Sequence, residues 1–261
     1  MVTPDRAGYW RWTPSGWRSA PTPAAGSAQV VDSWSVDSGR VRRLDRHLAR
    51  FAAGSRSVVP EVPDELLRGA AAAVGDLAWP AGSWFPRVEV HRDPVRILLW
   101  LRPAPPRSTT ATLWVPPDPD PRRAPTRKGP DLAVLAGLRE RAQDEGHDDA
   151  LLLGPDGAVR EAAHSALLWW RDGELREPPA EGRLSSVTAS IVLGVARAAG
   201  IPTGVERAGP EDLAGVEVWA LNALHGARTL ERIGPHACAP SVRAGWMRAA
   251  LGQRRPPAAG R

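Results

Sequence analysis

The residue with the most specific chemistry in this sequence is its one lysine, Lys128. The chain has 261 residues, of which 34 are Lys or Arg, and every basic position except Lys128 is arginine. Arginine stays charged, whereas a lysine amine can lose its proton and attack a carbonyl group, so only lysine can form a Schiff base. A single lysine could also be present by chance on a solvated loop. The sequence around Lys128 has to distinguish a chemical role from chance.

A carboxylate that could work with this lysine follows it in the sequence. Glu161 comes near the end of a predicted hairpin strand, residues 158–162. Such a pair suits pyridoxal 5′-phosphate, because an amine holds its aldehyde and a carboxylate keeps its ring nitrogen protonated. A glutamate at the end of a strand is also commonly just solvated, so the pair by itself leaves both interpretations open.

A third sequence feature predicts a phosphate site. The segment Leu184-Ser185-Ser186-Val187-Thr188 begins a predicted helix, and the first turn of a helix offers free amide groups and the positive end of the helix dipole. Capping by Ser185 or Ser186 would account for the same residues without any ligand. Arg50 could add a bidentate guanidinium if the fold brings the two halves of the chain together.

The pattern of the first half predicts helices and strands mixed in one α+β domain. Asp45 is expected to cap the first helix and Gly54 to end it, with Leu44, Leu48 and Phe51 on its apolar side. Residues 64–73 form a second predicted helix. The strands are predicted at residues 29–36 and 40–43, joined by a turn, and then at 85–91, 95–101 and 110–115, as strands of one sheet.

The second half reads as an α/β domain. A helix capped by Asp131 is expected to end near Gly146, and another helix is expected at residues 186–199. Strands are predicted at residues 149–153, 158–162, 166–171 and 216–221, the last of these being the final clear strand.

A proline-dense stretch, residues 116–125, separates the two halves and cannot join a helix or a central strand. We therefore predict an N-terminal domain at residues 1–115, a linker at 116–127 and a C-terminal domain at 128–261. Lys128 would then begin the second domain.

Composition excludes several classes of protein. Hydrophobic content of 43% and charged content of 24% are ordinary for a folded chain. Near the N-terminus we find no apolar run long enough for a signal or a membrane span, which predicts a cytoplasmic protein with no membrane partner. One cysteine, Cys238, excludes an internal disulfide and a cysteine zinc site, and the six histidines lack zinc spacing, so we expect no metal. The net charge of +5 is spread among acids, so we expect no nucleic-acid partner.

Five segments in a fixed order resemble the fold-type IV pyridoxal-phosphate enzymes, also called aminotransferase class IV. This superfamily includes branched-chain and D-amino-acid aminotransferases and aminodeoxychorismate lyase. The resemblance covers about residues 29 to 230. Its segments are Arg46-His47-Leu48-Ala49-Arg50-Phe51, Arg127-Lys128-Gly129-Pro130-Asp131-Leu132, the strand from Asp149 with Asp156-Gly157 and Glu161, Leu184-Ser185-Ser186-Val187-Thr188, and Val216 to Gly226.

The resemblance implies a two-domain fold, with pyridoxal 5′-phosphate in the interdomain cleft of a homodimer. It implies that Lys128 holds the cofactor as a Schiff base and moves the proton, and that Glu161 pairs with the pyridinium nitrogen. Leu184 would pack on the cofactor ring. The phosphate would be held by Arg50, by the amides of Val187 and Thr188, and by the turn at Asn222 and Ala223.

Three departures from the family pattern bear on activity. Ser185 and Ser186 stand where Pro and Gly are usual, so that the Ser186 side chain could either crowd the phosphate or bind it. Ala133 replaces a tyrosine common five residues after the lysine, and Ala223 replaces a frequent hydroxylic residue. These losses weaken the inference to full transaminase activity more than the inference to the fold.

For function, we expect a pyridoxal-phosphate enzyme acting on a small amino-bearing carboxylic acid. The missing tyrosine, the compact length and the sequence from Asn222 to Gly226 favour a reaction like that of aminodeoxychorismate lyase, releasing pyruvate and 4-aminobenzoate. A transaminase between a small amino acid and a 2-oxo acid is the alternative, and a non-catalytic relic of the fold is a further one. Candidate substrate contacts, each as easily a bystander, are Arg87, Arg102 and His225.

Overall fold

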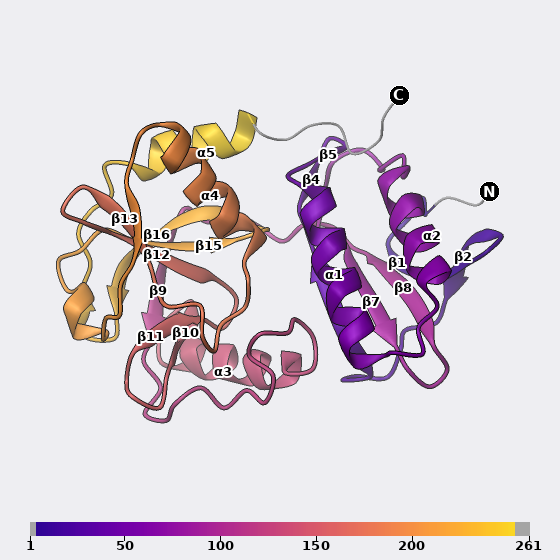
Figure 1. Ribbon diagram of the computed structural model, residues 1–261, viewed down its shortest axis with the longest axis horizontal. Helices are drawn as coiled ribbons and strands as arrows, with labels where there is room; N and C mark the ends of the chain where they lie inside the picture. Colours follow the sequence, from indigo (N-terminus) through magenta and orange to yellow (C-terminus); the bar gives the residue numbers. More distant parts are fainter. Residues whose placement is uncertain (1–3, 254–261) are drawn as a thin grey trace. The chain divides into compact units, whose positions relative to one another are not determined.

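A computed structural model describes residues 4–253 of the chain (Figure 1). Its contacts divide these residues into two compact units. The first unit contains the residues up to Pro106 together with Arg127–Pro130, and the second contains Arg107–Thr126 and Asp131–Gln253. These limits differ from the predicted domain limits, because the Pro-rich stretch lies in the second unit and Lys128 lies in the first.

The first unit is built on a five-stranded sheet with the order β2-β1-β8-β7-β3 and antiparallel neighbours throughout. A small three-stranded sheet has the order β5-β4-β6. The strands are β1 (Gly8–Thr13), β2 (Gly16–Ala20), β3 (Ala28–Ser33), β4 (Val36–Asp37), β5 (Arg40–Val41), β6 (Ser83–Trp84), β7 (Arg87–His91) and β8 (Arg96–Leu101).

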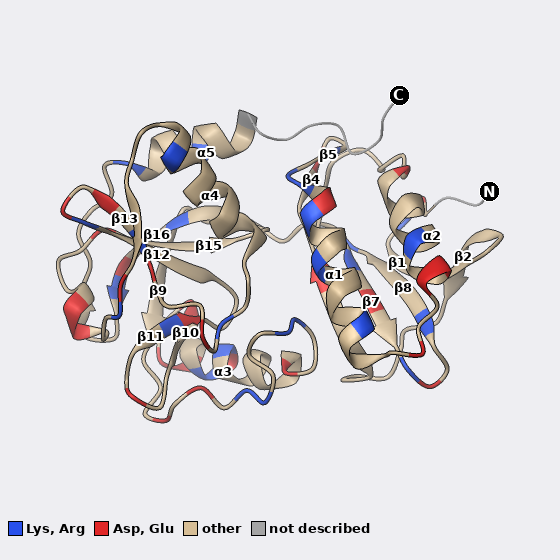
Figure 2. Cartoon of the chain, viewed as in Figure 1, with Lys and Arg blue, Asp and Glu red and all other residues tan. Residues whose placement is uncertain are grey.

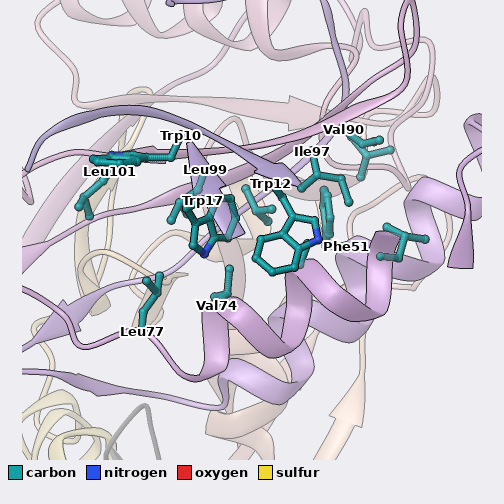
Figure 3. Close-up of a cluster of buried hydrophobic side chains, with 14 of the residues drawn as sticks. Trp10, Trp12, Trp17, Phe51, Val74, Leu77, Val90, Ile97, Leu99 and Leu101 are labelled. Carbon is teal, nitrogen blue, oxygen red and sulfur yellow. The ribbon is translucent and has the colours of Figure 1, made fainter. Parts of the chain in front are cut away.

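Helices α1 (Leu44–Val58) and α2 (Asp64–Gly75) supply the other side of the first core. Side chains alternate along a strand, so every second residue of β1 and β8 enters this core. Figure 3 shows Trp10, Trp12 and Trp17 packed with Phe51 and Val74 of the helices. Large aromatic side chains at these strand positions therefore fill a core.

The predicted limits of α1 are wrong at both ends. Arg43 is the N-cap residue, and the carboxylate of Asp45 binds the Arg43 guanidinium at 2.6 Å instead of capping the helix. Gly54 lies inside the helix. A Cβ at Gly54 would lie 3.0 Å from a methyl group of Val30, so the glycine permits close packing on β3 rather than ending the helix.

The second unit has a nine-stranded mixed sheet with the order β11-β10-β9-β16-β15-β12-β13-β14, and β17 pairs with β16. Neighbours are parallel at β9·β10, β9·β16 and β13·β14. The strands are β9 (Thr110–Trp114), β10 (Asp149–Leu153), β11 (Val159–Ala162), β12 (Ala166–Arg171), β13 (Glu174–Glu177), β14 (Thr203–Val205), β15 (Val218–Asn222), β16 (Gly226–Ile233) and β17 (His236–Ala237).

The placement of residues 110–115 in the first sheet is wrong. Strand β9 lies between β10 and β16 in the second sheet. Both of its partners come later in the sequence and run parallel to it, so no hairpin turn beside β9 reveals the pairing. The strand at 216–221 is also not the last one, because β16 follows it directly as an antiparallel partner.

Three α-helices belong to the second unit, namely α3 (Leu132–Asp144), α4 (Val187–Ala198) and α5 (Ala244–Gln253), with a short 3-10 helix η1 (Glu211–Leu213). The predicted starts of α3 and α4 are confirmed, but the Asp131 carboxylate accepts the N–H groups of Arg123 and Ala124 and does not cap α3. Among the residues the structure describes, no helix is long and apolar enough to cross a membrane. Helices α1 and α2 both carry basic and acidic residues (Figure 2).

Candidate functional site

Lys128 lies in the first unit, beside strand β3. Its carbonyl oxygen accepts a hydrogen bond of 2.8 Å from the N–H of Val31. The next residue, Gly129, has φ of 151°, and a Cβ there would lie 2.7 Å from both Gln29 O and Val30 Cα. Only glycine allows the chain to run this close to β3. The backbone of the lysine is thus fixed by the sheet, and its side chain is half-buried.

Arg50, a predicted phosphate ligand, is held by the next residue of β3, Asp32. The Asp32 carboxylate is completely buried and accepts hydrogen bonds from Arg50 Nε at 2.7 Å and Arg50 Nη2 at 2.9 Å. His47 Nδ1 lies 2.8 Å from the same carboxylate. Burial opposes ionisation of Asp32, but the Arg50 charge and the His47 hydrogen bond outweigh it, so the pKa of Asp32 is below its ordinary value.

Arg87 and Arg102 lie together in the first unit. Their guanidinium carbons are 4.8 and 4.2 Å from the ring centroid of Trp100, which stacks on Tyr9. Arg87 binds the buried carboxylate of Glu89, with its Nε 2.7 Å from Oε1. Burial and the neighbouring Arg87 lower the pKa of Arg102 to about 10, which still leaves Arg102 charged at neutral pH. The two arginines and Trp100 therefore form one cluster, in which the Arg102 guanidinium is able to bind a carboxylate.

In the second unit Glu161 is buried and held by two donors. Its Oε1 atom accepts the N–H of Leu184 at 2.9 Å and lies 2.9 Å from Arg122 Nη1. Arg122 also binds both oxygens of Asp120, with Nη2 2.8 Å from Oδ2. Both donors to Glu161 use one oxygen. Among the described residues, no hydrogen bond is made by the other oxygen, Oε2.

The protonation of Glu161 is set by opposing effects. Burial raises the pKa of the Glu161 carboxyl, and Arg122 and the Leu184 amide lower it, with a net increase above the ordinary value. Arg122 and Leu184 hold Glu161 through one carboxylate oxygen. The other oxygen can accept a hydrogen bond from a protonated ring nitrogen. The residues present thus fit the pyridine ring of the cofactor implied by the sequence.

Helix α4 begins at the predicted phosphate segment. Ser186 is its N-cap, and the Ser186 hydroxyl accepts the N–H of Ala189 at 3.2 Å. This bond uses the Ser186 side chain as a cap, which was one of the two interpretations of that residue. In the part of the chain that the structure describes, the main-chain N–H groups of Val187 and Thr188 have no acceptor, as expected of the first turn of a helix.

The turn between β15 and β16 holds Asn222 and His225. The Asn222 side chain is bonded at both ends, since its Nδ2 donates to Ser165 Oγ at 3.0 Å and its Oδ1 accepts the N–H of His225 at 2.8 Å. His225 Nδ1 accepts the N–H of Ser108 at 3.1 Å. Burial, followed by the charges of nearby arginines, lowers the pKa of His225 to about 4, so its ring is neutral at pH 7.

The predicted site residues therefore fall into two groups. Lys128 and Arg50 each hydrogen-bond to β3 in the first unit, through Val31 and Asp32, whereas Glu161 and Leu184 are hydrogen-bonded to each other in the second. Sequence reasoning missed Asp32 and Arg122. An aspartate within the apolar strand after Val30 and Val31 was an available signal for Asp32. Arg122 carried no such signal, since it lies in a stretch that we interpreted as a linker.

Comparison with known sequences gives one family. The sequence model described as amino-transferase class IV matches residues 29–233, which is well over half of the chain. A search of curated proteins finds no match.

Solved structures with a similar fold cover nearly the whole chain. The T.th. branched-chain amino acid aminotransferase in complex with N-(5'-phosphopyridoxyl)-L-glutamate is 19% identical, with a TM-score of 0.81 and 97% and 96% of the two chains covered. The fold IV-transaminase CpuTA1 from Curtobacterium pusillum is 18% identical, with a TM-score of 0.76 and coverage of 95% and 98%. A hypothetical aminotransferase from Mycobacterium tuberculosis is 17% identical, with the same TM-score and coverage. At these identities the likeness shows the fold.

Proposed function

The chain belongs to the amino-transferase class IV family, and on that premise we propose that it is an enzyme that exchanges an amino group between a small amino-bearing carboxylic acid and a 2-oxo acid. Pyridoxal phosphate is the cofactor of this family, and when bound it supplies an electron sink for the reacting carbon atom. The observation that carries the proposal is Glu161, because it is buried, bonded through Oε1 and leaves Oε2 for the ring nitrogen.

Lys128 is the proposed catalytic residue. Its amine would hold the cofactor covalently and then carry the proton between the substrate carbon and the cofactor, two tasks that arginine cannot perform. The hydrogen bond from Val31 and the close approach at Gly129 support this role, since both fix the backbone from which the amine extends.

Five further groups are proposed to hold the cofactor. Glu161 would keep the ring nitrogen protonated, and Leu184 would pack on the ring. Arg50, oriented by Asp32, would bind the phosphate as a preformed cation. The remaining phosphate contacts would be the N–H groups of Val187 and Thr188 and the turn at Asn222 and Ala223.

The substrate carboxylate is proposed to bind Arg102. Arg87 already forms an ion pair with Glu89. Among the described residues, Arg102 makes one hydrogen bond, to the carbonyl oxygen of Phe85 at 2.9 Å, and no ion pair. The charge of Arg102 is therefore available to a ligand. Assembly as a homodimer and a cytoplasmic location remain predictions, and the first can be measured by analytical ultracentrifugation.

Release of pyruvate from aminodeoxychorismate is the second candidate reaction. The observation in its favour is the turn from Asn222 to Gly226, where His225 is neutral and its Nδ1 is an acceptor, so its Nε2 carries the hydrogen. A neutral donor of this kind could bind a hydroxyl or carboxylate of the substrate. The missing hydroxyl at Ala223 fits the same candidate.

Purified protein should be titrated with pyridoxal phosphate and then supplied with amino acids and 2-oxo acids. We expect visible absorbance on cofactor binding, its loss in Lys128→Ala but not in Arg127→Ala, and conversion of added 2-oxo acid to amino acid. Pyruvate formed from aminodeoxychorismate without an added 2-oxo acid would instead favour the second candidate. A protein that takes up no pyridoxal phosphate would contradict both, and would support a non-catalytic relic of the fold.

A further inference from the structure

Arg228 is a buried cation that lacks a countercharge in contact with it. It lies on β16 and is 5% exposed. Its Nη2 donates to Ser165 Oγ at a long 3.3 Å. Within the described residues its Nε–H has no acceptor, and no carboxylate oxygen lies within 4 Å of its guanidinium. A buried guanidinium without a paired anion is costly, so this position calls for an anionic ligand.

Ser165 adds a second unused donor at the same place. Its Oγ accepts from Arg228 Nη2 and from Asn222 Nδ2, and both of those atoms are donors only. A hydroxyl group accepts two hydrogen bonds and donates one, so the Ser165 O–H remains to be donated. Among the described residues this hydrogen has no acceptor.

His225 supplies a third donor close by. Its Nδ1 is occupied as an acceptor of the Ser108 N–H, so the neutral ring carries its hydrogen on Nε2. Burial lowers its pKa, and the charges of Arg228, Arg139 and Arg107 lower it further. The ring therefore lies within electrostatic reach of three arginines, in surroundings that attract an anion.

The acid with the strongest effect on Arg228, Asp149, does not satisfy these donors. Asp149 is close enough to raise the pKa of Arg228, against the larger lowering by burial. Its carboxylate is already bonded, with Oδ1 accepting the Ala150 N–H at 3.1 Å and Oδ2 accepting the His164 N–H at 3.1 Å. His164 Nδ1 also lies 3.1 Å from Oδ1. Asp149 thus reduces the local charge without pairing with Arg228.

We propose that Arg228, Ser165 and His225 form an oxyanion-binding site in the second unit, for a carboxylate or phosphate group. The site shares Ser165 with Asn222, whose turn is assigned to the cofactor phosphate. The oxyanion has two possible sources, the phosphate of the cofactor and a carboxylate of the substrate. This choice of sources rests on the proposed function.

The first test compares thermal unfolding of the cofactor-free protein with and without inorganic phosphate and succinate. Arg228→Met keeps side-chain length and removes the charge, and the matched control is Arg232→Met, on the same strand at an exposed position. We expect at least one anion to raise the Tm of the wild type and of the control, and to leave that of Arg228→Met unchanged. Without anion, Arg228→Met should unfold no earlier than the wild type, since it removes an unpaired buried charge. Equal anion responses in all three proteins would overturn the proposal.

Arg228→Lys is a second variant, which tests the site even if Arg228→Met fails to fold. It keeps a positive charge but loses the Nε donor, and we expect about 10-fold weaker anion binding, since a hydrogen bond to a charged group has roughly that effect. Anion binding as tight as in the wild type would contradict a role for the guanidinium.

The second test separates the two sources. If Arg228 binds the cofactor phosphate, Arg228→Met should weaken pyridoxal-phosphate binding about 10- to 100-fold and leave succinate binding to the loaded protein intact. If it binds a substrate carboxylate, the two effects should be reversed, and no effect on either ligand would refute the site. A protein that binds no pyridoxal phosphate, yet shows Arg228-dependent stabilisation by inorganic phosphate, would disprove the proposed function and leave the site standing.

Discussion

The carbonyl oxygen of Lys128 lies 2.8 Å from the N–H of Val31, so the lysine is bonded to strand β3 one residue before Asp32. Asp32 in turn holds the Arg50 guanidinium. Two residues proposed to serve the cofactor, Lys128 and Arg50, thus depend on the same short piece of β3. Changes near this strand should affect both.

Gly129→Ala should weaken the anchoring of Lys128. The added Cβ would lie 2.7 Å from the backbone of β3, at a φ that L residues rarely adopt, so the loop has to move. We expect a loss of about 1–3 kcal/mol in the free energy of unfolding and weaker cofactor binding. Urea denaturation measures the first. In the control Gly137→Ala, on helix α3 with open space around it, unfolding free energy should stay equal or rise.

Asp32→Asn should lower stability at neutral pH by about 3 kcal/mol, because it leaves the Arg50 charge without its buried partner. The pKa of Asp32 is below its ordinary value of 3.8 in the folded protein. Its contribution is therefore present above pH 3.8 and is lost as the pH falls below that value. Unfolding free energy measured against pH should be flatter in this acid range for the variant.

The exposed pair Arg43–Asp45 gives a control for that variant. Asp45→Asn should change the unfolding free energy at neutral pH by less than about 1 kcal/mol. An equal loss in the two variants would argue against a special role of the buried carboxylate.

Arg122→Met should destabilise the second unit by about 3–5 kcal/mol, since it leaves the Glu161 carboxylate buried without a cation and leaves Asp120 only the longer ion pair with Arg160, at 3.8 Å. A double-mutant cycle with Glu161→Gln isolates the pair. We expect a coupling energy of about 1–3 kcal/mol from chemical denaturation. Additive effects would show that Arg122 does not stabilise the charge of Glu161.

His225→Gln should alter the pH dependence of stability in a defined window. The pKa of His225 is lowered from 6.5 to about 4, so the unfolded chain takes up a proton at higher pH than the folded one. Stability from this residue is full above pH 6.5 and is lost as the pH falls toward 4. The wild type should lose unfolding free energy between these values more steeply than the variant, and parallel pH curves would contradict the buried neutral ring.

Local patterns predicted most elements of this fold. Short continuous apolar runs marked β10 and β12, and serine at position 186 marked the start of α4, because these signals depend on near neighbours in the sequence. The pairing of β9 was predicted wrongly, since its parallel partners β10 and β16 are distant in sequence. The N-terminal hairpin of β1 and β2 was not predicted, although its tryptophans fill the first core.

The site was predictable only in part, for a related reason. Lys128, Glu161 and Arg50 have side chains whose chemistry is visible from residue type. Asp32 and Arg122 hold Arg50 and Glu161 in place, and this role is visible only from contacts between residues distant in the sequence. Likewise, only its burial and the lack of an acceptor for its Nε–H among the described residues distinguish Arg228 from the other arginines.

The covalent attachment site of pyridoxal phosphate tests the central claim most directly. The cofactor-loaded protein should be reduced with borohydride, digested and analysed by mass spectrometry, with Lys128→Arg as the control. Because Lys128 is the only lysine, we predict the label on the peptide containing residue 128 in the wild type and none there in the variant. A wild-type protein with no label, or one labelled only at its N-terminal amine, would contradict the account.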